Sequence, residues 1–178
     1  MKLQLLALGG LAALFLSASS AQPAASASPM VSAPVHCQVP CGIYADKMRI
    51  DMWMEDVATI KKAMTQIQSL EGSEAQDRNQ MVRWIMTKEQ HASQIQENVA
   101  SYWMAQRIKA PKATADAEAM AKYHKQLATL HAITVSAMKC KQTVEADHAA
   151  SIRTLAQEFS KTYFDGEDLE HLSGHHWK

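Results

Sequence analysis

Residues 45–71 read ADKMRIDMWMEDVATIKKAMTQIQSLE, and this stretch decides the fold. Its apolar side chains recur at alternating steps of three and four residues: Ile50, Trp53, Val57, Ile60, Met64 and Ile67. That spacing forms a single apolar stripe on an α-helix, because 3.6 residues complete one helical turn. The stretch therefore predicts a long amphipathic helix that ends at Gly72 and needs partners for one face.

Three further stripes with the same spacing follow along the chain. Their members are Met81, Ile85, Ala92, Ile95, Val99 and Tyr102; Met120, Tyr123, Leu127, Leu130, Thr134 and Ala137; and Ile152, Leu155, Phe159 and Tyr163. Ser73 with Gln76 resembles a capping box that starts the second helix, and Thr114 is a candidate N-cap for the third. We place the break before the fourth helix at residues 139–143, where Thr143 is a candidate cap. One long helix over residues 114–164 stays open as an alternative.

Turn residues nearly vanish after Ala45: Gly occurs only at 72, 166 and 174, and Pro only at 111. Sheets and hairpins need turn residues at intervals of about ten positions, so their absence argues for helices with few connections. Four amphipathic helices, each with one apolar stripe, are stable only when packed together. The sequence thus predicts an all-α fold, an antiparallel up-down four-helix bundle over residues 45–164 with an irregular N-terminal segment.

The full chain has 178 residues with 18 basic and 18 acidic side chains, so its formal charge is zero. A nucleic-acid-binding protein would show a basic excess, which excludes that class. Residues 1–21 combine Lys2, an apolar run and small residues, the pattern of a signal peptide. The run is shorter than the roughly 20 residues that a spanning helix needs, although a membrane anchor remains the alternative. We therefore expect an exported protein, periplasmic or extracellular, without a membrane segment after signal removal.

Two further segments flank residues 36–164, one on each side. Residues 22–35 are rich in Ala, Ser and Pro, which predicts a linker or propeptide. Signal peptidase prefers small residues before its cut, so cleavage after Ala21 or Ala27 fits better than cleavage after Val35. Residues 165–178 form a polar tail that contains three histidines, and we expect it to be disordered.

Residues 36–44 read HCQVPCGIY and hold the densest set of metal-ligand side chains in the chain. In an exported protein, Cys37 and Cys41 could form a small disulfide. A zinc site is another possibility, although adjacent His and Cys are poorly placed for a tetrahedron. The third cysteine, Cys140, lies on a predicted helix and is typical of a buried small apolar residue.

A different site forms if His36 is the first residue of the mature chain. Its free amine, the amide nitrogen and thiolate of Cys37, and the thiolate of Cys41 can then lie in one plane, with Pro40 and Gly42 shaping the turn between the two cysteines. Square-planar coordination by nitrogen and sulfur selects Ni(II) or Cu(II). The His36 imidazole can add a fifth, axial ligand, and the opposite face stays open to a small redox substrate.

This segment resembles the N-terminal nickel hook of the nickel-containing superoxide dismutases, whose motif is H-C-x-x-P-C-G-x-Y. Every fixed position of that motif is present, and a short four-helix bundle also follows the hook in that family. Weaker likeness continues through residues 49–51, 88–90 and 102–103. The resemblance implies a superoxide dismutase with one nickel ion per subunit, which converts superoxide to oxygen and hydrogen peroxide through a Ni(III)/Ni(II) cycle. It also implies a homohexamer and a protease that exposes the N-terminal histidine.

The resemblance assigns roles to single residues. His36, Cys37 and Cys41 are the implied nickel ligands, and Tyr44 orients superoxide or water beside the open face. Asp51 and His91 match the acidic and basic positions that steady the axial imidazole. Two departures stand out, because Gln38 replaces a common acidic residue and His91 stands where an Arg is also seen.

Three functional hypotheses follow. The first is a dismutase, with local attraction of the superoxide anion by Lys47, Arg49 and Lys88. The second is an exported nickel- or copper-binding protein without turnover. The third is a helical bundle with a small N-terminal disulfide. Metal analysis with thiol counting separates the third from the others.

Overall fold

The computed structural model describes residues 39–40, 42–73 and 77–169, all of which belong to one compact unit. These residues form four α-helices and one π-helix and contain no strand. The elements are α1 (Asp46–Glu71), α2 (Arg78–Asn98), η1 (Val99–Arg107), α3 (Ala117–Gln142) and α4 (Ala146–Tyr163). The π-helix η1 continues α2 directly, so the chain turns only between α1 and α2, between η1 and α3, and between α3 and α4.

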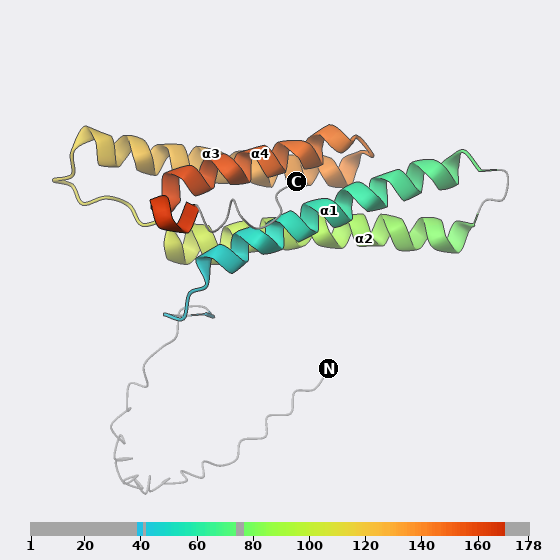
Figure 1. The fold of residues 1–178 in the computed structure, drawn as a ribbon, viewed down its shortest axis with the longest axis horizontal. Coiled ribbons are helices and arrows are strands. Elements are labelled where there is room, and N and C mark those ends of the chain that lie inside the picture. Colours follow the sequence, from blue (N-terminus) through green and yellow to red (C-terminus); the bar gives the residue numbers. More distant parts are fainter. Residues whose placement is uncertain (1–38, 41, 74–76, 170–178) are drawn as a thin grey trace, which may run out of the picture. The chain divides into compact units, whose positions relative to one another are not determined.

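The helices run alternately in opposite directions, and each α-helix packs against two neighbours (Figure 1). The contacts join α1 to α2, α2 to α3, α3 to α4, and α4 back to α1. This closed ring of contacts confirms the predicted all-α, up-down four-helix bundle. None of the described helices combines the length and apolar character that crossing a bilayer requires.

The apolar stripe of α1 is buried along its whole length, as its spacing predicts. An aromatic cluster fills the end of the bundle near η1, where the ring centroids of Trp53 and Trp103 are 5.7 Å apart and those of Trp103 and Phe159 are 4.9 Å apart. Burial of such rings is among the largest apolar contributions to a core. The early turns of two other stripes differ from the prediction, since Ile85 is 40% and Met120 37% exposed. The period of these stripes is correct, but these two members of the stripes remain partly exposed.

Two predicted helix starts are wrong by a few residues. The N-cap of α2 is Asp77, whose Oδ1 accepts a hydrogen bond from the Gln80 amide at 3.1 Å, and the N-cap of α3 is Asp116, which accepts one from the Ala119 amide at 2.8 Å. A capping side chain bonds an amide two or three residues further on. The predicted caps Ser73 and Thr114 lie too early for this, and Gln76 lies outside the described residues.

The break between α3 and α4 excludes the alternative of one long helix. Thr143 lies just after α3 with extended backbone angles, and its hydroxyl donates to the Lys139 carbonyl at 3.3 Å and accepts from the Glu145 amide at 3.3 Å. Thr143 is therefore the C-cap of α3, which confirms the predicted cap at the break. The N-cap position of α4 is Glu145.

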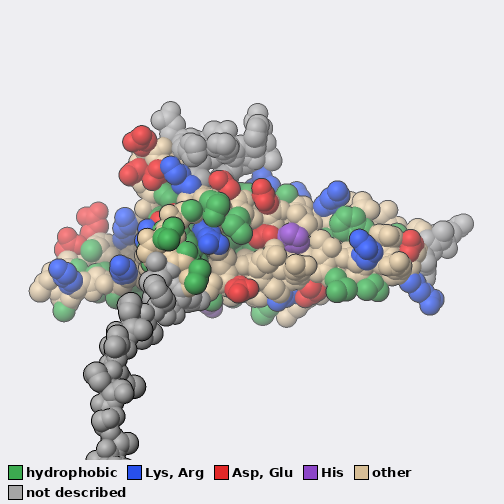
Figure 2. Space-filling view, turned by 90° about the horizontal axis from the view of Figure 1, so that it is seen from below, with side chains coloured by type: hydrophobic (Ala, Val, Ile, Leu, Met, Phe, Trp, Pro, Cys, Tyr) green, Lys and Arg blue, Asp and Glu red, His purple; other side chains and the backbone are tan. Residues whose placement is uncertain are grey.

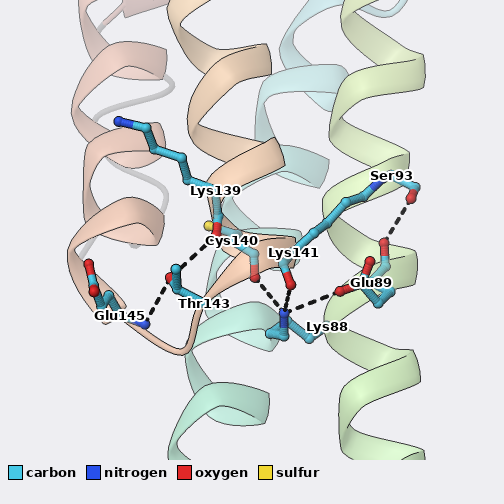
Figure 3. Close-up of polar contacts among 8 residues, drawn as sticks. All are labelled: Lys88, Glu89, Ser93, Lys139, Cys140, Lys141, Thr143 and Glu145. Carbon is cyan, nitrogen blue, oxygen red and sulfur yellow. Dashed lines mark hydrogen bonds and ion pairs between the residues drawn. The ribbon is translucent and has the colours of Figure 1, made fainter.

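A buried lysine from α2 completes the C-terminal end of α3 (Figure 3). Lys88 Nζ donates to the carbonyl oxygens of Cys140 at 2.7 Å and Lys141 at 2.5 Å, and it lies 3.2 Å from Glu89 Oε1. The last four carbonyls of a helix have no partner within the helix, and their end of the helix dipole attracts a positive charge. Lys88 therefore joins α2 to α3, and its burial is inconsistent with the predicted role in attracting superoxide.

We expect Lys88→Met to destabilise the bundle by about 2 kcal/mol, because hydrogen bonds from a charged donor are the stronger ones and two carbonyls lose their partner. Urea denaturation of the processed chain measures this. Lys61→Met on the exposed side of α1 is the matched control, and its stability should be close to that of the wild type. Equal stability of the two variants would contradict the role of Lys88.

Candidate metal centre

The segment before α1 contains a tight turn at the position that the motif predicts. The Ile43 amide donates to the Pro40 carbonyl at 2.8 Å, which closes a four-residue turn. Its third residue, Gly42, has φ +80°, in the left-handed region that favours glycine. The Val39–Pro40 peptide bond is cis. The predicted ligands His36, Cys37 and Cys41, and the departure at Gln38, lie outside the described residues.

Two consecutive residues of η1 contact this segment on either side of the turn. The Gln106 side-chain amide donates to the Ser101 carbonyl at 2.8 Å and reaches the Val39 carbonyl at 3.5 Å. The Arg107 guanidinium lies over the Tyr44 ring, with Cζ 4.2 Å from the centroid. Such a stack is a cation–π contact, for which Arg is the usual partner. The end of η1 thus holds the chain both before and after the turn.

Tyr44 is one of the described residues and follows directly after the turn. Its ring meets Tyr102 edge-on at 5.9 Å between centroids, in addition to the Arg107 stack. It remains 38% exposed. The ring is therefore held on two sides and open to solvent, as an orienting role for a small anion would require.

Asp46, in the first turn of α1, connects three elements at the base of this segment. Its carboxylate accepts hydrogen bonds from Tyr102 Oη at 2.5 Å, Tyr163 Oη at 2.8 Å, and Arg107 Nε at 2.8 Å and Nη2 at 2.5 Å. The Ala45 amide donates to Tyr102 Oη at 3.0 Å. A bidentate Arg–carboxylate pair defines orientation as well as distance. We call Asp46, Tyr102, Arg107 and Tyr163 the Asp46 cluster.

The pKa values of the Asp46 cluster follow from burial and from these bonds. Burial alone would raise the pKa of Asp46, but hydrogen bonds from Arg107, Tyr102 and Tyr163 keep it below its usual value. Burial and the adjacent Asp46 carboxylate raise the pKa of Tyr102 to about 12, and the same two causes raise the pKa of Tyr163. At neutral pH the cluster therefore holds an ionised Asp46–Arg107 pair and two neutral tyrosines.

The tail reaches this region as well. Residues 166–169 form a helical turn, and Asp168 Oδ1 lies 2.7 Å from Lys47 Nζ. The expected disorder of the tail is thus wrong for these residues, and residues 170–178 lie outside the described part of the chain. A hollow of about 490 Å³ opens between Tyr44, Lys47, Arg107, Phe164 and Asp168, with other residues around it.

The cations that the sequence suggested for attracting superoxide are engaged in other contacts. Lys47 pairs with Asp168, and the Arg49 guanidinium lies over the Tyr102 ring at 4.6 Å. Lys88 is buried at the end of α3. The Lys47 ammonium is thus paired with the Asp168 carboxylate, and the Lys88 ammonium donates to two carbonyls and lies beside Glu89.

Of the two residues predicted to steady the axial imidazole, His91 has a partner that the sequence reading missed. Its Nδ1 lies 2.6 Å from Asp56 Oδ1. Burial raises the pKa of Asp56, although the bond to His91 acts in the opposite direction. Asp51 makes no side-chain hydrogen bond to another residue that the structure describes. Because His36 lies outside the described residues, the roles of Asp51 and His91 stay predictions.

The sequence contains a feature from which the burial of Asp56 could be predicted. It follows Trp53 by three positions and precedes Val57 and Ile60, so it lies on the edge of the apolar stripe of α1. A carboxylate at such a position is buried and needs a partner. For Asp46 and Arg107 the periodicity offers no comparable signal, because their contact depends on the winding of η1.

The model of one protein family, described as nickel-containing superoxide dismutase, matches residues 29–166 and so covers the hook motif and all five helices. No significant match was found among curated proteins or among solved structures. Within the described residues, no three His, Cys, Asp or Glu side chains are grouped to hold a metal ion.

Proposed function

This chain belongs to the nickel-containing superoxide dismutase family, and from that premise we propose that His36, Cys37 and Cys41 hold its nickel ion. The family places the protein among the enzymes, as an oxidoreductase with nickel as cofactor and superoxide as substrate. The hook motif, whose six fixed positions are all present, is the observation that carries the assignment of ligands.

The chemistry of the donors and the local backbone fit nickel. The amine of His36, the amide nitrogen and thiolate of Cys37, and the thiolate of Cys41 form a set of two nitrogen and two sulfur donors, which suits square-planar Ni(II). The His36 imidazole would supply a further nitrogen donor. The described turn from Pro40 to Ile43, with Gly42 at φ +80°, supports a chain that reverses where the second thiolate stands in the sequence.

Bound nickel supplies a one-electron couple, Ni(III)/Ni(II), through which one superoxide is oxidised to oxygen and a second, with two protons, is reduced to hydrogen peroxide. The protein's own residues bind and orient the anion. Tyr44, partly exposed and held by Arg107 and Tyr102, is the described side chain placed to orient superoxide or the water that delivers a proton. The Asp46–Arg107 pair keeps the base of the hook in one arrangement.

We expect His36→Ala to keep its nickel and to lose about 10- to 100-fold in turnover. The substitution preserves the terminal amine and the square plane but removes the axial imidazole, which tunes the metal. Nickel analysis and stopped-flow decay of superoxide, on chains that begin at residue 36, measure the two properties. His131→Ala, on the exposed side of α3, is the control. Unchanged turnover in His36→Ala would indicate that the axial assignment is wrong, and absence of turnover in the nickel-loaded wild type would favour a carrier.

Export, processing and assembly are part of the same proposal. Residues 1–21 direct export to the periplasm or the extracellular space, and a second protease removes residues 22–35 to expose His36. Hydrophobic side chains gather on the face that Figure 2 shows, and Val39 and Ile43 within the hook are 87% and 81% exposed. Exposed apolar groups that gather on one face mark contact surfaces, which supports subunit contacts near the hooks. The number of six subunits is what the family resemblance implies. A processed chain that sediments as a monomer would contradict this assembly.

A further inference from the structure

The winding of η1 decides which side chains meet at the base of the hook. In an α-helix, residues five apart are rotated by about 140° from each other. In a π-helix the bonds run from residue i to i+5, so residues five apart stand on the same side. The backbone of η1 shows this spacing, since the Ile108 amide donates to the Trp103 carbonyl, five residues earlier, at 2.9 Å.

Tyr102 and Arg107 are five residues apart, and both donate to the Asp46 carboxylate. With α-helical winding, one of them would point away from α1. The π-helix is therefore the reason that the Asp46 cluster can form. Such local π segments inside a longer helix occur frequently at functional sites.

The Asp46 cluster determines the orientation of Arg107, and Arg107 in turn determines that of Tyr44. Asp46 holds the guanidinium by two of its nitrogens, which defines the plane of the group. The Cζ atom of that group lies over the Tyr44 ring, 4.2 Å from its centroid. The positive charge is paired with Asp46, so attraction of an anion over distance is not its main contribution. Gln106, one residue earlier, reaches Val39 on the other side of the turn.

We propose that Arg107 is a positioning residue of this dismutase, which holds the Tyr44 ring beside the Pro40–Ile43 turn of the hook through the π-helical contact with Asp46. The inference rests on the proposed function, because Arg107 would hold Tyr44 for its proposed role in orienting superoxide. Lys cannot replace Arg here, since an ammonium neither binds both carboxylate oxygens in a plane nor stacks flat on a ring.

The first test uses the metal-free chain and does not depend on activity. Carbon-13 labelling of the four tyrosine rings allows Tyr44 to be followed by NMR, with Tyr123 on α3 as an internal reference. We expect Arg107→Lys to shift the Tyr44 ring signals and leave those of Tyr123 in place. Arg83→Lys, on the exposed side of α2, should move neither. Unshifted Tyr44 signals in a folded Arg107→Lys chain would overturn the proposal.

The second test is a double-mutant cycle on the nickel-loaded enzyme. We expect Arg107→Lys to lower kcat about tenfold with unchanged nickel content, because a small misplacement of an orienting group is costly. In the Tyr44→Ala background the same substitution should have no further effect, since two residues that act through one contact are not additive. An equal loss in both backgrounds would overturn the positioning role. Loss of activity in the wild type itself would instead overturn the proposed function, so the two failures are distinguishable.

Discussion

Cys41→Ser is expected to lose both its nickel and its dismutase activity completely. A serine hydroxyl is a hard oxygen donor that stays protonated near neutral pH, whereas the proposed square plane needs a thiolate. The fold should persist, because the described contacts of the hook with the bundle involve Val39 and Tyr44. Metal analysis, superoxide decay and circular dichroism on one preparation measure the three properties.

The matched control is Cys140→Ala. Cys140 lies fully buried on α3, and burial raises the pKa of its thiol to about 11, so it stays protonated and cannot replace a hook ligand. This variant should retain nickel and activity and lose about 1 kcal/mol of stability, as expected for a small core truncation. Full activity with bound nickel in Cys41→Ser would show that the hook assignment is wrong.

The second large effect concerns the N-terminus. A chain that begins at Ser28 should be inactive, and cleavage directly before His36 should restore activity. In the longer chain the nitrogen of His36 is part of a peptide bond and is no longer an amine, so the square plane loses that donor. The experiment uses one protein with a specific protease site inserted before His36, and it follows nickel content and superoxide decay before and after cleavage.

The control for proteolysis itself is the same protein with a different protease site. Cleavage at that site leaves two extra residues in front of His36 and does not alter the bundle. This control protein should remain inactive after cleavage. Equal activity of the uncut and the cut chains would contradict the role of the amine. Sequencing the N-terminus of the protein from its host then shows whether the processing that we propose takes place.

Much of the fold could be predicted because it depends on periodic burial. The stripe from Ile50 to Ile67 is buried as its spacing predicts, and the break near Thr143 separates α3 from α4. The N-caps of the helices were less predictable. Ser73 and Asp77 are both residue types that suit the N-cap of α2 and lie four positions apart, so only the geometry of the first turn selects between them. The hook motif predicts a ligand set from local sequence, and this set stays a prediction, because His36, Cys37 and Cys41 lie outside the described residues.

The surroundings of Tyr44 were not predictable in the same way. Tyr102 and Phe159 could be assigned to the core by their spacing, but nothing in the sequence between Val99 and Arg107 distinguishes π from α winding. That difference changes which residue faces Asp46. The partners of His91 and Lys88 likewise come from other helices, 35 and 52 positions away along the chain.

By itself, the sequence determined the helical class and the number of packed α-helices, because periodicity is a property of short segments. The spacing of the ligand types also predicts the chemistry of the hook. Only the tertiary structure decided that Asp46 joins Tyr102, Arg107 and Tyr163, and that Arg107 lies over Tyr44. The physical reason is that these contacts join residues far apart in the chain and depend on how each helix is rotated against its neighbours. Packing of the aromatic core and the winding of η1 determine that rotation, and with it the environment of Tyr44.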